Sequence, residues 1–114
     1  MTVDRKRRVA SPDALLNKRV KVIVAPFQHR IGPWQEQLAH LRSARMLRAL
    51  SDRDRGHAAE LLALVIAARI ELDAVLAQLG EEAVTQHSLV TAVRSSLMRL
   101  CEELEDLAGS ALGR

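Results

Sequence analysis

The side chains best suited to chemistry in this 114-residue chain are four histidines and one cysteine. His29, His40, His57 and His87 fall in different segments of the sequence. Only His57 has a potential co-ligand nearby, because Glu60 stands three residues further along and would share a helix face with it. A stable metal site needs at least a third protein ligand, and none is visible. We therefore expect no metal and no cofactor.

Catalytic arrangements are equally hard to assemble. Cys101 falls beside a predicted helix seam, where a cysteine packs as a small apolar residue rather than acting as a nucleophile. No Ser-His-Asp set and no glycine-rich phosphate loop can be built from the sequence. Glu71 and Asp73 stand two residues apart and would face different sides of a helix. The sequence therefore predicts a protein that is not an enzyme.

One alternative keeps a chemical role for His87, which stands near the start of a predicted helix. It resembles the helix-borne acceptor histidine of phosphotransfer domains in this respect. The acidic residue and the proline that follow the histidine in many sensor kinases are absent here. The resemblance would imply transfer of a phosphoryl group to His87.

Basic side chains form the second group of interest. Residues 1–56 carry 13 Lys and Arg against 5 Asp and Glu, whereas residues 57–114 carry 4 against 9, so the halves have net charges of +8 and −5. Such a basic segment can neutralise nucleic-acid phosphates. Aromatic residues make up only 2% of the chain, which argues against a base-stacking platform. The candidate nucleic-acid-binding residues are Arg5, Lys6, Arg7, Arg8, Lys18, Arg19, Lys21, Arg42, Arg45 and Arg48.

An acidic cluster within residues 102–106 offers these basic residues a different partner. Its four carboxylates would lie near the C-terminal end of a helix, where the helix dipole disfavours negative charge. We expect a compensating cation from the basic arm or from the arginines of residues 42–48, in the same chain or in a dimer mate. The basic side chains thus have two alternative partners, a nucleic acid and the acidic helix.

The N-terminal half contains the least certain elements. Residues 1–10 are basic and lack any period, which predicts a disordered arm. A helix is expected over 12–24, although the alternation of valines at 20, 22 and 24 would also suit a strand. Pro26, Gly32 and Pro33 predict a loop or kink at 25–33. A second helix is expected at about 34–50, followed by a polar break at 51–56.

The C-terminal half predicts a helical hairpin. A helix over about 57–79 should stop at Gly80, and another over about 86–108 should be capped by Thr85 and end at Gly109. The short connection makes these two helices antiparallel neighbours. The expected fold class is all-α, with the hairpin completed by one or two N-terminal helices into a small bundle. Its single domain would cover residues 11–109, and residues 110–114 would form a frayed tail.

Both hairpin helices are more apolar than one packing partner requires. The first is apolar most of the way round, and the second repeats apolar residues at alternating spacings of three and four. Two such hairpins could pair into a homodimer and bury the excess. The candidate interface residues are Leu62, Ile66, Ile70, Val90, Val93, Leu97, Leu100 and Leu104.

These features favour a non-enzymatic helical interaction or assembly module, a homodimer that also binds an unidentified protein. The alternative is a nucleic-acid-binding accessory or regulatory protein that uses the basic arm on DNA or RNA. The longest apolar run, Leu61 to Ala68, has eight residues and is too short to cross a bilayer, and no secretory signal is evident. We therefore expect no membrane partner and a cytoplasmic location.

Overall fold

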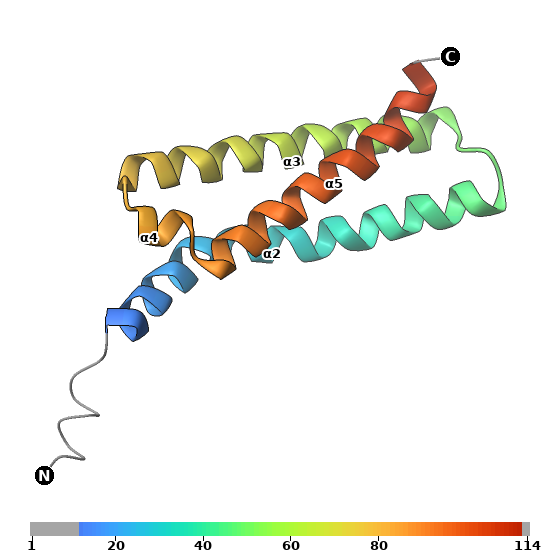
Figure 1. Ribbon diagram of the computed structural model, residues 1–114. Coiled ribbons are helices and arrows are strands. Elements are labelled where there is room, and N and C mark those ends of the chain that lie inside the picture. The colour runs from blue at the N-terminus through green and yellow to red at the C-terminus, as the bar shows by residue number, and fades with distance from the viewer. Residues whose placement is uncertain (1–11, 113–114) are drawn as a thin grey trace, which may run out of the picture.

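The computed structural model describes residues 12–112 and shows four helices packed against one another. They are α2 (Pro12–Leu47), α3 (Asp52–Leu79), the single-turn α4 (Glu82–Thr85) and α5 (Ser88–Leu112). The expected all-α fold with an antiparallel C-terminal hairpin is confirmed. Figure 1 shows α2 and α3 running in opposite directions, with α5 crossing both diagonally on one side. No strand occurs within residues 12–112.

Helix α2 is one continuous helix, so the loop alternative at 25–33 and the separate second helix are wrong. The strand alternative for residues 20–24 is also excluded. Pro26 and Pro33 are exposed and seven residues apart, so both lie on the outer side of the helix. The carbonyls that lose their helical donors there can bind water, and the helix bends in its first third (Figure 1).

Burial explains why α2 continues past both prolines. An apolar stripe with alternating spacings of four and three residues faces the core from Val20 to Leu41. A loop at 25–33 would break this stripe and expose its central members, Phe27 and Ile31. The stripe consists of Val20, Val24, Phe27, Ile31, Trp34, Leu38 and Leu41.

Helix α3 begins at Asp52, so the predicted break at 51–56 is mostly helix. A capping box starts it. The Ser51 hydroxyl oxygen accepts a hydrogen bond from the Asp54 amide at 3.1 Å, and an Asp54 carboxylate oxygen accepts one from the Ser51 amide at 3.4 Å. At the other end, Gly80 has φ 61° and its amide donates to the Leu76 carbonyl at 3.1 Å. The predicted stop at Gly80 is confirmed.

The start of α5 differs from the prediction. Thr85 belongs to α4, and His87 caps α5 instead, because its Nδ1 accepts a hydrogen bond from the Leu89 amide at 3.1 Å. The end also differs, since α5 passes through Gly109 and reaches Leu112. A helix does not require its last glycine to act as a cap when the backbone there keeps helical geometry.

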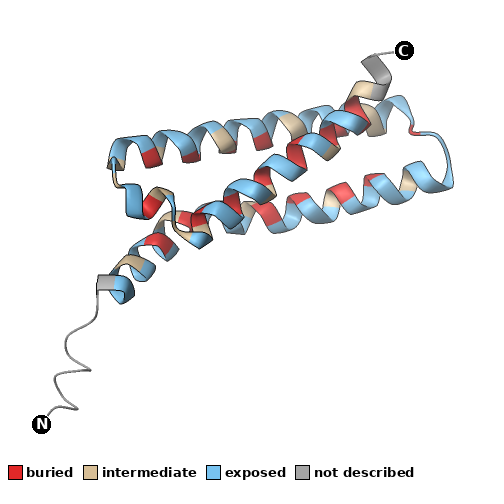
Figure 2. Cartoon of the chain, in the orientation of Figure 1, coloured by how far each residue is buried: buried red, intermediate tan, exposed pale blue. Residues whose placement is uncertain are grey.

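One hydrophobic core joins the three long helices, and Figure 2 shows its buried residues along the sides that face each other. The predicted α5 seam is buried as expected. On α3 the buried core positions are Ala58, Leu61, Val65, Ala68, Leu72 and Leu76. Within the described residues, no helix is both long and apolar enough to span a membrane.

Candidate interaction surfaces

The outward side of α3 carries two exposed isoleucines in a row of alanines, and the exposed charged residues Glu60, Glu71 and Asp73 stand beside this row. Ile66 and Ile70 are 39% and 65% exposed, and alanines occupy the neighbouring outward positions. These positions lie opposite the core side of the helix, because they follow helical spacing about half a turn away from Leu61, Val65 and Leu72. We call this surface the α3 outer face, and it consists of Ala59, Ala63, Ile66, Ala67, Ile70, Ala74 and Ala77.

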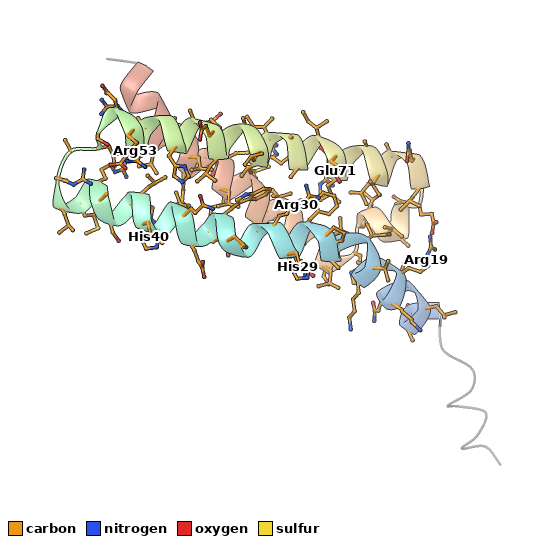
Figure 3. The ribbon with its side chains drawn as sticks, turned by 180° about the vertical axis from the view of Figure 1, so that it is seen from behind. Arg19, His29, Arg30, His40, Arg53 and Glu71 are labelled. Carbon is orange, nitrogen blue, oxygen red and sulfur yellow. The ribbon has the colours of Figure 1, made fainter. Side chains whose placement is uncertain are left out.

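The exposed sides of the other long helices carry polar and charged residues together with separate exposed apolar residues such as Val22, Met46 and Met98. The exposed side of α2 carries His29, Glu36 and His40, and that of α5 carries Arg99 and Glu102. Figure 3 shows His29 and His40 on α2. Charged residues usually cover a solvent-facing helix side, so two exposed isoleucines one helical turn apart within a row of alanines suggest a contact surface.

The predicted interface residues separate into two groups. Leu62 is half-buried beside the α3 outer face, and Ile66 and Ile70 belong to that face. The five α5 members instead lie inside the chain's own core, each at most 4% exposed, and in this fold they are not accessible to a partner. The buried five are Val90, Val93, Leu97, Leu100 and Leu104.

The sequence pattern did not predict that the alanines of the α3 outer face form part of an exposed surface. Alanine gives a weak signal, because it suits a helix core, a helix surface and a helix interface alike. The available signal was the recurrence of alanine on one side of the helix, which becomes visible only once the inward side is known. At the edge of the face, Asp73 is engaged within the chain, 3.4 Å from an Arg94 guanidinium nitrogen.

Two arginines near the end of α2 form ion pairs with carboxylates near the end of α5. Arg42 forms an ion pair with Glu103, and an Arg45 guanidinium nitrogen lies 2.7 Å from an Asp106 carboxylate oxygen. Arg48 lies 3.4 Å from Asp54 at the start of α3. Two of the four carboxylates in the predicted acidic cluster thus receive their cations from α2 of the same chain.

The remaining basic candidates lie at the beginning of the chain. Arg19 donates two hydrogen bonds to the Glu81 carboxylate, at 2.8 and 2.7 Å. These hydrogen bonds, and then the positive charge of Arg19, hold the pKa of Glu81 below its ordinary value. Lys18 and Lys21 are exposed and form no ion pair within the described part of the chain. Arg5, Lys6, Arg7 and Arg8 lie outside the described residues.

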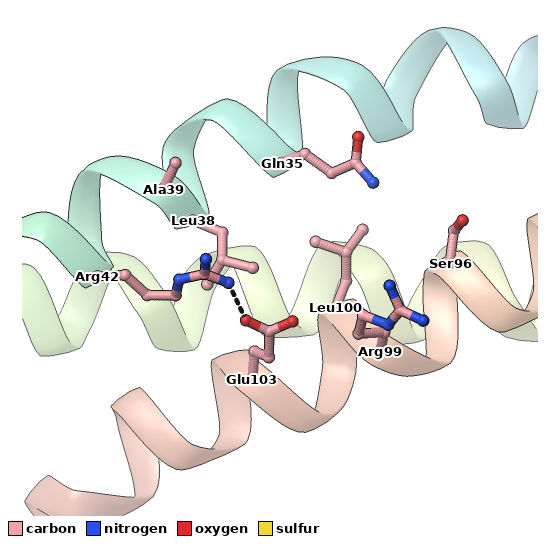
Figure 4. A pocket seen from close by; sticks show the side chains of 8 residues that line it. All are labelled: Gln35, Leu38, Ala39, Arg42, Ser96, Arg99, Leu100 and Glu103. Atoms are coloured by element: carbon pink, nitrogen blue, oxygen red, sulfur yellow. Dashed lines mark hydrogen bonds and ion pairs between the residues drawn. The ribbon is translucent and has the colours of Figure 1, made fainter.

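A small pocket of about 250 Å³ lies between α2 and α5 (Figure 4). Its polar groups are the Arg42–Glu103 pair, Gln35, Ser96 and Arg99. The lining includes no histidine, no cysteine and no second carboxylate, so Ser96 has no general base beside it. The pocket therefore offers polar contacts but no recognisable catalytic pair.

The histidines do not come together. Among residues 12–112, no three His, Cys, Asp or Glu side chains are placed to share a metal ion. His87 uses both of its ring nitrogens, because its Nε2 lies 2.6 Å from the side-chain amide oxygen of Asn17 while Nδ1 caps α5. This leaves neither nitrogen free as a phosphoryl acceptor in this conformation. Cys101 is buried in the core.

Comparison of the chain with protein-family models, with curated proteins and with solved structures found no match.

Proposed function

We propose that this protein is a non-enzymatic helical interaction module that assembles as a homodimer through the α3 outer face. The observation that supports this function is the exposure of Ile66 and Ile70 within a row of outward alanines on α3. Burying those two side chains removes apolar surface from water, which favours association.

The order of residues on the α3 outer face suits a second copy in antiparallel orientation. A two-fold axis near Ala68 pairs Ile66 with the partner's Ile70, and it pairs Ala59 with the partner's Ala77, because both pairs are centred on residue 68. The alanines allow the two helix backbones to approach closely. The face is about 27 Å long, which is small for a stable interface, so we expect a weak dimer.

Sedimentation velocity over a concentration series tests the proposal. We expect a monomer–dimer equilibrium that approaches the dimer at about 100 μM, and the Ile66→Glu/Ile70→Glu variant should remain a monomer because each pair would bring buried carboxylates together. Met46→Glu is the matched control, since Met46 is 87% exposed at the far end of α2. A wild-type monomer throughout the series, or a dimer that survives the double substitution, would refute the proposal.

Nucleic-acid binding is the second candidate function. It is favoured by Lys18 and Lys21, which keep their charge unpaired by any described residue, and by the Arg5–Arg8 run that precedes them in the sequence. It is weakened by Arg19, Arg42 and Arg45, whose guanidinium groups already bind carboxylates. A gel shift with duplex DNA and with RNA at about 50 mM salt, with and without residues 1–10, separates the two functions. Failure of the full chain to shift either probe would reject this candidate.

A further inference from the structure

An apolar groove lies at the N-terminal end of α2, and it shares no residue with the α3 outer face, although Leu79 at the end of α3 lines part of it. It has a volume of about 550 Å³ and is lined by Leu15, Val22 and Ile23 of α2 and by Leu79 at the end of α3, together with Lys18 and Arg19. Leu15 is 54% exposed and Val22 is 70% exposed, so its apolar lining is open to solvent. Figure 1 shows this part of α2 projecting beyond the other helices.

Polar contacts fix the two walls of the groove relative to each other. The two hydrogen bonds between Arg19 and Glu81 tie α2 to the segment that joins α3 to α4. The hydrogen bond between Asn17 and His87 ties α2 to the start of α5. The groove is therefore formed before any ligand arrives, which lowers the entropic cost of binding.

The charge around the groove is positive. Lys18 lines it, Lys21 follows on the next turn, and neither forms an ion pair with a described residue. No carboxylate lines it, and the nearest one described above, that of Glu81, is neutralised by Arg19. An apolar floor beside free ammonium groups is complementary to a ligand that combines apolar side chains with carboxylates.

We propose that this groove binds a short amphipathic helix of a partner protein, whose apolar side chains enter the groove and whose flanking carboxylates meet Lys18 and Lys21. An amphipathic helix repeats its apolar anchors every three, four and seven residues along one side, and Leu15 and Val22 are themselves seven residues apart on α2, so the two apolar sides can run alongside each other. Nucleic acid fits less well, because its phosphates would lie against an apolar floor. A membrane surface also fits less well, because Ile23 and Leu79 are half-buried within a concave site.

Fluorescence anisotropy with a synthetic peptide tests the proposal. The probe is a fluorescein-labelled helix of about twelve residues with leucines on one side and glutamates elsewhere, and the comparison peptide carries lysines in place of the glutamates. We expect saturable binding of the acidic peptide and at least about tenfold weaker binding of the basic one. Binding should also weaken as salt is raised.

Three variants locate the binding site. Val22→Ser and Val22→Glu should each weaken binding of the acidic peptide by about tenfold or more, because the first removes an apolar contact and the second places a charge against the apolar anchor of the peptide. Lys18→Glu/Lys21→Glu should weaken binding of the acidic peptide and reduce the salt dependence of that binding. The control is Ile66→Glu/Ile70→Glu on the α3 outer face, which should bind the acidic peptide with wild-type affinity. Peptide binding is therefore tested independently of whether the chain forms the proposed homodimer. Circular dichroism checks that each variant is folded.

Three results with the peptides would overturn the proposal: no saturable binding of the acidic peptide, equal binding of both peptides, or peptide binding that Val22→Glu leaves intact. It would also be overturned by binding to anionic phosphatidylserine vesicles that depends on Val22 and displaces the peptide. The last result would assign the groove to a membrane. A change of sedimentation on Val22→Ser substitution would assign it to a second copy of this chain and would likewise overturn the proposal.

Discussion

At the scale of single residues, His87 joins three segments of the chain. Its Nδ1 caps α5 through the Leu89 amide, and its Nε2 lies 2.6 Å from the Asn17 side-chain oxygen on α2. With Nδ1 accepting a hydrogen bond, Nε2 must carry the proton that is donated to Asn17. The side chain therefore acts in the structure as a neutral imidazole with a fixed tautomer, which is a structural role.

Replacing His87 should cost stability. We expect His87→Ala to lower the free energy of unfolding by about 1–2 kcal/mol, because it removes a helix cap and a second hydrogen bond. Urea denaturation followed by circular dichroism measures the change. His40→Ala is the control and should be near neutral, since His40 is exposed on the outer side of α2. An equal effect of both substitutions would contradict the assigned role.

Two carboxylates make the free energy of unfolding depend on pH in the acidic range. Hydrogen bonding by Ser51 and pairing with Arg48 hold the pKa of Asp54 below its ordinary value of 3.8, and hydrogen bonding by Arg19 holds that of Glu81 below 4.5. A lowered pKa in the folded state contributes stability that is complete above the unfolded value and is lost as pH falls through the folded value. The urea midpoint should therefore fall as the pH drops below 4.5, and Glu81→Gln should reduce that fall. Glu36→Gln, at an exposed site without an ion pair in the described structure, should leave the pH dependence unchanged.

At the scale of the elements, α2 shows how burial can override local preference. A proline inside a helix costs about 3 kcal/mol relative to alanine, and α2 contains two. Seven buried side chains along one side of the helix offset that cost. Arg30 adds to the same region, since its Nε donates to the Pro26 carbonyl at 3.2 Å and its guanidinium group lies 4.8 Å from the centre of the Phe27 ring.

Substitution of Pro33 distinguishes a continuous helix from a loop. In a helix, Pro33→Ala restores an amide that can donate to the His29 carbonyl, so we expect the free energy of unfolding to rise by about 1–3 kcal/mol. In a loop, the same change would lower stability by increasing the entropy of the unfolded chain. Thermal and urea unfolding of the variant show directly whether the substitution raises or lowers the free energy of unfolding. A loss of stability would show that α2 is not a regular helix at Pro33.

At the scale of the whole molecule, the charge asymmetry of the sequence is largely satisfied inside the chain. The basic α2 lies against the acidic end of α5, and Arg30 of α2 lies 3.2 Å from Glu71 of α3. These pairs are solvent-exposed, so each contributes little stability by itself. Their effect is on arrangement, because they favour the register in which the two oppositely charged helices meet.

A charge swap tests this arrangement. Arg42→Glu should lower the free energy of unfolding by about 1 kcal/mol, because it places two carboxylates together, and adding Glu103→Arg should restore most of the loss. Urea denaturation of the wild type, both single variants and the double variant completes the cycle. Additive losses in the double variant would show that the two side chains do not interact in solution.

The sequence by itself determined the helical class, the stop at Gly80 and the buried seam of α5. Each of these depends on signals that act within a few residues, namely spacing and end caps. The continuity of α2, the partners of its arginines and the choice of the inner side of α3 were decided by the tertiary structure. Helix α3 is apolar on both sides, so only the position of α2 and α5 could leave Leu61 and Val65 inside and Ile66 and Ile70 in solvent. The physical reason is that burial depends on neighbours distant in the chain, whereas caps and spacing do not.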